Sequence, residues 1–280
     1  MIEVIFLWVL ALIWIIFASI QDLRTREVSN WIGGSLVIFA LGFRFFYSLF
    51  SETISFGFFY QGLIGLGIFF VLGNVLYYAR LFAGGDAKLM MALGPVLAFS
   101  DNFMINLKIF VSFFFLFLFA GAIYGLIITI SLSLKNFKSF KKEFVVQFRK
   151  NKKKFFLGVL LGLIVMILGI QESLFFTLGI ILFAFPYLYL YAKAVDEKCM
   201  IKDIKVKDLT EGDWLYKDVK VKGRTIKATW GGIEKKDIND LRKKYKKVKI
   251  RQGIPYVPVF LIAFVVLIYI WQFGLWNAFW

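Results

Sequence analysis

The chain consists of long apolar runs separated by short polar breaks. A helix needs about 20 apolar residues to cross roughly 30 Å of hydrocarbon. Stretches near that length are residues 2–20, 31–50, 57–80, 87–105, 108–134, 155–171, 173–194 and 255–273. The run in 87–105 stops at Phe99, and only a short polar break near Glu172 separates 155–171 from 173–194. The pattern therefore predicts an all-α polytopic membrane protein with about 6–8 transmembrane helices.

One sizeable polar segment, residues 195–254, precedes the last apolar run. Polar and apolar residues alternate from Lys217 to Ile226 around Lys222-Gly223, which predicts a hairpin. Residues 233–247 have the pattern of a short helix with solvated charges. We therefore expect a small α+β cytosolic domain. The predicted division is 1–194 for a transmembrane helical core, 195–254 for the cytosolic domain and 255–280 for the final transmembrane helix.

Composition agrees with a membrane protein and narrows the chemistry. The chain is 60% hydrophobic and contains no histidine, which excludes catalytic triads and zinc sites that need imidazole. Cys199 is the only cysteine, so an intrachain disulfide is impossible and a thiolate metal cluster is not expected. We expect neither a metal nor another cofactor.

The net charge of +16 is unevenly distributed. With the predicted spans, 32 of the 34 Lys and Arg residues lie on one side of the membrane, because only Arg44 and Lys108 fall on the other (34 minus 2). An excess of basic residues marks the cytoplasmic side. These charges predict attraction to anionic membrane lipids rather than to nucleic acid. The oligomeric state is left open.

An aspartate interrupts the apolar pattern in the stretch LFAGGDAKLMMALG, residues 81–94. An ionised side chain within the membrane costs about 2.5–3.5 kcal/mol on insertion scales, so it usually has a partner or a function. Lys88 is two residues from Asp86 and points to another helix face. One alternative is that Asp86 only caps the helix that follows. Gly84 and Gly85 would let an extended substrate backbone approach closely, or they form a plain loop.

A second aspartate, Asp22, ends the first apolar span. The two spans that follow lead out and back, so Asp22 and Asp86 return to the same face. Two close carboxyl groups share one proton, and such a pair activates water while hydrogen-bonding to a carbonyl group. The helix dipole favours the anion at Asp86 and disfavours it at Asp22, which predicts Asp86 as the base and Asp22 as the protonated acid.

Together, the segments DLRTREVSNWI (22–32) and GGDAKLMMALG (84–94) resemble the prepilin and preflagellin peptidases, membrane aspartyl proteases of the GxGD group. The archaeal branch is most similar, because its members also carry a polar domain before the last helix. The resemblance implies that Asp22 and Asp86 are the catalytic pair, with Gly84, Gly85 and Lys88 as motif residues. It covers most of the chain in layout and about two dozen residues in motif.

The resemblance also implies the substrate. It is a prepilin or preflagellin (archaellin) precursor whose short basic leader is removed at the cytoplasmic face of the cell membrane; the sequence does not choose between the two. Ala83 stands where the strict motif has glycine. Without a cysteine-rich domain or a visible methyl-donor site, we expect no methyltransferase activity. The basic leader must be met by local acids, such as Glu27 or those at 211–213, or by lipid head groups.

Two other functions fit parts of the pattern. A transporter or proton-coupled carrier could use membrane-edge acids, although no second half repeats the first. A presenilin-like protease shares the aspartyl chemistry, but it carries Tyr-Asp where this chain has Gln21-Asp22. Its Pro-Ala-Leu element is also missing, and the C-terminal prolines lie instead in GIPYVP, residues 253–258.

Overall fold

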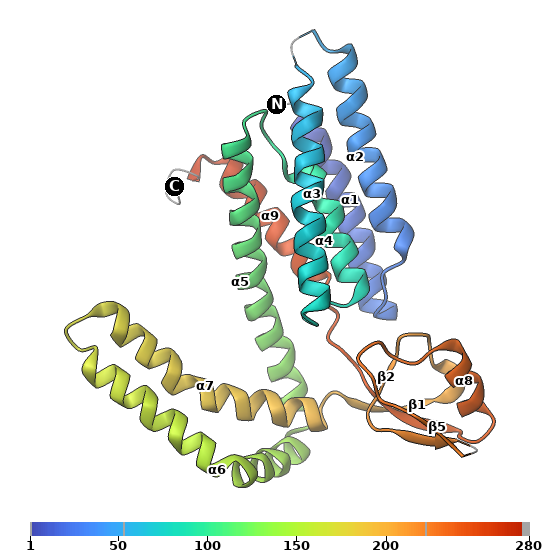
Figure 1. Ribbon diagram of the computed structural model, residues 1–280, viewed down its shortest axis with the longest axis vertical. Coiled ribbons are helices and arrows are strands. Elements are labelled where there is room, and N and C mark those ends of the chain that lie inside the picture. Colours follow the sequence, from blue (N-terminus) through green and yellow to red (C-terminus); the bar gives the residue numbers. More distant parts are fainter. Residues whose placement is uncertain (1, 53, 222, 276–280) are drawn as a thin grey trace. The chain divides into compact units, whose positions relative to one another are not determined.

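The computed structural model describes residues 2–52, 54–221 and 223–275 (Figure 1). Its long helices are α1 (Ile2–Thr25), α2 (Asn30–Phe50), α3 (Gly57–Tyr78), α4 (Gly84–Leu97), α5 (Phe103–Lys135), α6 (Phe137–Leu168), α7 (Ser173–Lys198) and α9 (Pro258–Gln272). Between α7 and α9 lie β1 (Ile201–Lys205), a 3-10 turn (Val206–Asp208), β2 (Trp214–Leu215), β3 (Val219–Val221), β4 (Arg224–Ile226), α8 (Lys235–Arg242) and β5 (Lys247–Arg251). The predicted fold class, a polytopic helical protein with a small α+β region before the last helix, is confirmed.

Within the described residues, five helices are long and apolar enough to cross a membrane, namely α1, α2, α3, α5 and α7. Helix α9 is apolar but has 15 residues. Helix α4 has 14 residues, or about 21 Å at 1.5 Å per residue. The predicted span 87–105 is therefore not one continuous helix. Pro95 lies near the end of α4, and the polar residues around Asp101 separate it from α5.

The chain divides into two compact units, Met1–Gly125 with Ile254–Trp280, and Leu126–Gly253. We call them the helical unit and the second unit. The domains expected from the sequence were divided according to whether a segment lies in lipid or in water. The two compact units are defined by contacts within the chain, so they do not test that division. That division stays a prediction.

Helix α4 lies in the core of the helical unit and packs against α1, α2 and α3. Lipid removes most of the hydrophobic drive for helix association, so close packing of small residues matters more than apolar area. Gly65 on α3 and Gly94 on α4 meet backbone to backbone, because a Cβ on either one would collide with the carbonyl oxygen of the other. Gly73 also lies close to the carbonyl of Ala87, which would stand 2.9 Å from an added Cβ. Glycines thus seat α4, and with it Asp86, against α3.

The far end of α4 is held by Arg44 of α2, which is fully buried. Its guanidinium donates to the carbonyls of Pro95 at 2.7 Å, Phe58 at 2.6 Å and Ala98. The last carbonyls of a helix have no partners in that helix. Arg44 therefore closes the end of α4, and it also lies over the Phe58 ring at 4.1 Å.

The second unit contains an α6–α7 hairpin and a small sheet. Glycines allow the two helices to pack backbone to backbone. Gly162 lies against the backbone of Phe183, and Gly179 lies against that of Met166. The antiparallel sheet has the order β1-β5-β2, and β3 pairs with β4 as a hairpin. Lys222, one of the two predicted hairpin residues, lies outside the described residues, while Gly223 has a φ of 80°. The predicted helix in 233–247 forms only as the shorter α8.

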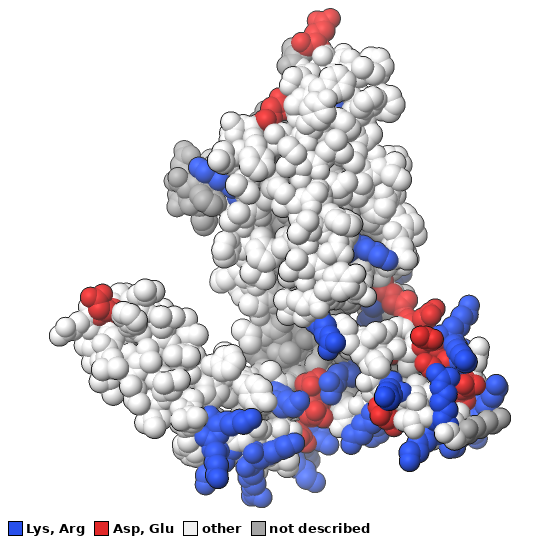
Figure 2. Space-filling model, viewed as in Figure 1, with Lys and Arg blue, Asp and Glu red and all other residues white. Residues whose placement is uncertain are grey.

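The small sheet, with β3, β4 and α8, forms a module with its own core, which includes Leu241, Ile250 and Val206. Arg251 of β5 binds Asp196 of α7 at 3.3 Å, and Tyr216 donates to Glu197 at 3.0 Å. Figure 2 shows most of the basic side chains on this module and near the start of α6, whereas the helical surfaces in view are largely uncharged. Large apolar side chains such as Ile38, 71% exposed, fit a lipid-facing surface.

Candidate active site

Asp22 lies in the last turn of α1, and its side chain is buried at 6% exposure. The helix ends at Thr25, and Arg26 takes a left-handed conformation with a φ of 59° that turns the chain away. One carboxylate oxygen of Asp22 accepts the backbone N–H of Val257 at 2.9 Å. The N–H of Tyr256 donates to the same carboxylate. The turn before α9 thus meets α1 at this aspartate, 235 residues away in sequence.

Asp86 is the third residue of α4, and its side chain is half-buried. Its carboxyl group accepts the backbone N–H of Ala83, which precedes the helix. The sequence offered Asp86 as a helix cap, but Asp86 lies inside α4, and Ala83 occupies the N-cap position without a side-chain capping bond. The carboxyl group of Asp86 also interacts with the charge on Asp22. The structure brings the two predicted aspartates together.

The loop after Asp22 packs onto the segment that carries Asp86. Gln21 and Ser29 close this loop through two hydrogen bonds. The side-chain amide of Gln21 donates from Nε2 to the Ser29 hydroxyl at 2.6 Å, and its Oε1 accepts the backbone N–H of Ser29 at 3.1 Å. Val28 lies against Gly85, so closely that a Cβ on the glycine would stand 3.2 Å from the valine Cβ. The lack of a side chain at Gly85 therefore allows the two segments to pack closely.

The remaining motif residues are placed differently from one another. Lys88 donates from Nζ to Oδ1 of Asn30 at 2.6 Å, which ties the first turn of α4 to the first turn of α2. This contact explains the lysine, since the sequence had found no suitable geometry for a pair with Asp86. Gly84 has open space around it, with a Tyr77 ring carbon 3.9 Å from where a Cβ would stand. The role expected for Gly84 beside a substrate backbone stays a prediction.

Two tyrosines border the pair and were not singled out from the sequence. Tyr256 lies in the turn before α9, and Tyr124 lies on α5. The charge of Asp86 acts on the Tyr256 hydroxyl, and that of Asp22 acts on the Tyr124 hydroxyl. The sequence feature that could have drawn attention to Tyr256 is its position between the two prolines of GIPYVP, directly before an apolar run. No sequence pattern connected that stretch to Asp22.

The described residues contain no group of three or more His, Cys, Asp or Glu placed to hold a metal ion. What the site offers is a pair of carboxyl groups amid apolar packing. Burial makes a second negative charge costly, so such a pair retains one proton. One ionised and one protonated carboxyl group can activate a water molecule and polarise a carbonyl at the same time.

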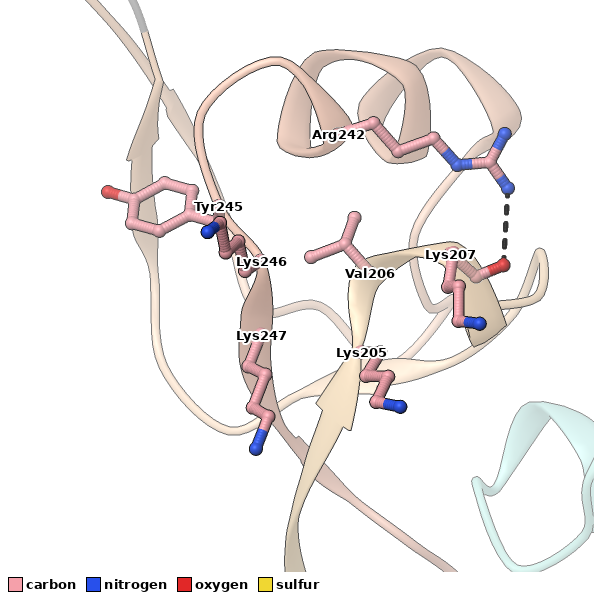
Figure 3. Close-up of a pocket in the computed structure, with 7 residues that line it drawn as sticks. All are labelled: Lys205, Val206, Lys207, Arg242, Tyr245, Lys246 and Lys247. Carbon is pink, nitrogen blue, oxygen red and sulfur yellow. Dashed lines mark hydrogen bonds between the residues drawn. The ribbon is translucent and has the colours of Figure 1, made fainter.

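A cavity of about 380 Å³ lies in the strand module (Figure 3). Its lining is strongly basic and consists of Lys205, Val206, Lys207, Arg242, Tyr245, Lys246 and Lys247. Lys205 and Lys247 stand directly opposite each other on β1 and β5, a like-charge pairing that costs stability. The lining has no carboxylate or nucleophile for hydrolysis, so the cavity is not a candidate for the reaction centre.

Residues 9–130 match the type IV leader peptidase family, and this range contains Asp22, Asp86 and the two segments around them. The predicted resemblance to prepilin and preflagellin peptidases is confirmed, and the transporter alternative is disfavoured. The matched region includes α2, α3 and α4 and most of α1 and α5.

Two curated relatives are both preflagellin peptidases. The protein of Methanocaldococcus jannaschii is 31% identical over 90 residues, and that of Methanococcus maripaludis is 27% identical over 89 residues. Each alignment covers 32% of this chain, and the chain spans 37% of each relative's length. No solved structure matches the chain.

Proposed function

We propose that this protein is a membrane aspartyl endopeptidase that removes the short basic leader from prepilin or preflagellin precursors. Asp22 and Asp86 would be the catalytic pair, at the cytoplasmic face of the cell membrane. The observation that carries the proposal is the meeting of these two carboxyl groups where the family's two matched segments pack together. The preflagellin peptidases among its relatives support the substrate class.

In the proposed reaction, the ionised aspartate takes a proton from water while the water oxygen attacks the scissile carbonyl carbon. The protonated aspartate hydrogen-bonds to the carbonyl oxygen and stabilises the tetrahedral intermediate. The C–N bond then breaks, and the leaving amine takes up a proton from the pair. This sequence uses only carboxyl groups and water.

The hydrogen bonds favour Asp22 as the ionised member. Its carboxylate accepts two backbone N–H groups, from Val257 and Tyr256, while Asp86 accepts one from Ala83. Hydrogen bonds to a carboxylate stabilise its charged form. The helix dipoles had predicted the opposite order, but they could not include the turn before α9. We therefore assign Asp22 as the base and Asp86 as the acid.

The leader would approach past the loop between α1 and α2. Among the acids considered for binding it, Glu27 is exposed in this loop, next to the Val28 that packs on Gly85. The acids Glu211 and Asp213 belong to the second unit. This arrangement supports Glu27 as the first contact of a basic leader, alongside anionic lipid head groups.

A cleavage assay in membranes tests the proposal. Peptides that join a basic leader to an apolar segment, of prepilin and of preflagellin type, are compared for the wild type, Asp22→Asn and Asp86→Asn. Both variants are expected to lose at least about 10³-fold in cleavage rate, because each removes one partner of the pair. Asp101→Asn, an acid in the loop between α4 and α5, is the control and should retain activity.

Thermal unfolding in detergent shows whether the variants still fold. Full activity in either dyad variant would remove that residue from the chemistry. An inactive wild type on both classes of peptide would contradict the proposed substrate.

A further inference from the structure

The turn before α9 contacts the site from a part of the chain outside the family match. Residues 252–256 have no regular secondary structure, and α9 begins at Pro258. The two N–H groups at Tyr256 and Val257 both point to the Asp22 carboxylate. Proline at 255 and 258 restricts the backbone on both sides of this turn. The turn is therefore a fixed element of the site.

The side chain of Tyr256 is held on three sides. Its ring lies 5.6 Å from the ring of Phe117 and 6.4 Å from that of Phe82, measured between centroids. Its hydroxyl lies against α5 at Gly121, where any Cβ would collide with the hydroxyl oxygen. A phenol with this packing has little freedom to move, so the fold fixes the position of its hydroxyl oxygen.

The hydroxyl of Tyr256 also interacts electrostatically with Asp86. Burial, and secondly the nearby Asp86 carboxyl group, raise the pKa of Tyr256 above its ordinary value. A phenol with a raised pKa stays protonated and remains a hydrogen-bond donor throughout the physiological range. One residue thus supports Asp22 through its backbone and holds a hydroxyl close enough to Asp86 for their charges to interact.

We propose that Tyr256 is a further catalytic residue, whose hydroxyl donates a hydrogen bond to the substrate carbonyl oxygen as that oxygen becomes negative. This role rests on the proposed peptidase function. When the water oxygen bonds to the carbonyl carbon, the π electron pair moves onto the carbonyl oxygen, where Asp86 and Tyr256 both donate. When the C–N bond breaks, the pair returns to the carbonyl, and Tyr256 is unchanged. Donors fixed in advance at such an oxygen act mainly on the transition state.

Tyr256→Phe keeps the ring against Phe117 and Phe82 and removes only the hydroxyl. The expected result is a decrease of about 10²-fold in kcat with KM nearly unchanged, the pattern for a donor engaged in the transition state. Tyr269→Phe, on the exposed side of α9, is the matched control and should keep wild-type kinetics. Tyr124→Phe asks whether the other bordering hydroxyl contributes equally. Wild-type kcat in Tyr256→Phe, or a loss shared by Tyr269→Phe, would overturn the proposal.

A second measurement is independent of cleavage. Tyrosines labelled with ¹³C at Cζ in the full-length protein are titrated by NMR, and Tyr256→Phe identifies the signal of Tyr256. At the high pH where a tyrosine titrates, Asp86 is ionised, so Asp86→Asn removes a nearby negative charge and should lower the pKa of Tyr256, while Tyr269 should not respond. Arg26, Tyr124 and Asp22 are the other titratable groups around the pair and stay unchanged in this comparison.

The two measurements distinguish a failure of the proposed peptidase function from a failure of the role proposed for Tyr256. If the wild type cleaves no leader peptide, the peptidase function fails and the catalytic role of Tyr256 fails with it, whatever the titration shows. If the wild type cleaves but the Tyr256 titration ignores Asp86→Asn, only the placement of the hydroxyl is wrong.

Discussion

At the scale of single residues, the two motif segments act through contacts with each other as well as through their carboxyl groups. Lys88 binds Asn30, and Val28 covers Gly85, so the segment after α1 is fastened to the start of α4. These contacts hold the segment that follows Asp22 against the segment that carries Asp86. Positioning groups of this kind affect rate more than stability, since small displacements of reacting groups are costly.

We expect Lys88→Met to lower leader cleavage about 10-fold while changing the free energy of unfolding by less than about 1 kcal/mol, because the Lys88 side chain is exposed. Asn30→Ala should have a similar effect. The double variant should be no worse than either single variant, because both remove the same bond. Cleavage kinetics and thermal unfolding check this, with Lys108→Met as the control. Fully additive losses would show that the bond does not position the site.

At the scale of elements, α4 is a short helix held at both ends and along its side. Gly65 and Gly94 allow its backbone to approach α3, and Arg44 closes its last turn. A 14-residue helix is too short to be fixed by its own hydrogen bonds. Its packing partners therefore determine where Asp86 stands.

Gly94→Ala should destabilise the helical unit by about 2–3 kcal/mol, because the added methyl group meets the backbone of Gly65 and forces the helices apart. Gly67→Ala, on α3 with open space around it, should be neutral or slightly stabilising. Thermal unfolding in detergent compares the two. Equal stability in both variants would mean that the α3–α4 crossing is not tightly packed.

Arg44→Met should lower stability by about 2–4 kcal/mol, because it leaves the carbonyls of Pro95, Phe58 and Ala98 without their donor. Cleavage should fall as well, since the far end of α4 is released. Arg24→Met, an exposed change on α1, is the matched control. Unfolding and leader-cleavage assays on the two variants provide the check, and an unaltered melting temperature for Arg44→Met would contradict the capping role.

At the scale of the whole molecule, charge predicts the orientation of the protein in the membrane. The loop with Glu27 and the strand module carry or adjoin most of the basic residues, whereas the loop at Asp101 lies between apolar helices. The excess of Lys and Arg predicts that the first two lie in the cytoplasm. The proposed site would then face the compartment where leaders are presented.

Single cysteines test that orientation. In a Cys199→Ser background, Asp101→Cys should react with a membrane-impermeant maleimide in right-side-out vesicles. Glu27→Cys should react only after the membrane is opened. Labelling of Glu27→Cys in sealed vesicles would place the loop, and with it Asp22, on the outer face and would contradict the cytoplasmic site.

The sequence alone determined the helical membrane class, the polar module before the last helix and the two aspartates as candidates. Runs of apolar residues report burial in lipid directly, and an acid within such a run stands out because of its cost. Hydropathy was less informative at 87–105, because it did not show that α4 ends at Leu97 or that Arg44 caps its last turn.

The tertiary structure decided how the site is assembled. The contact of Val257 with Asp22 joins residues 235 positions apart, and no local pattern encodes it. That contact is the basis for proposing Asp22 as the ionised member of the pair, an order that the helix dipoles alone did not predict. It also brings Tyr256 to the aspartates. Residue types revealed which groups could react, while packing determined which of them meet.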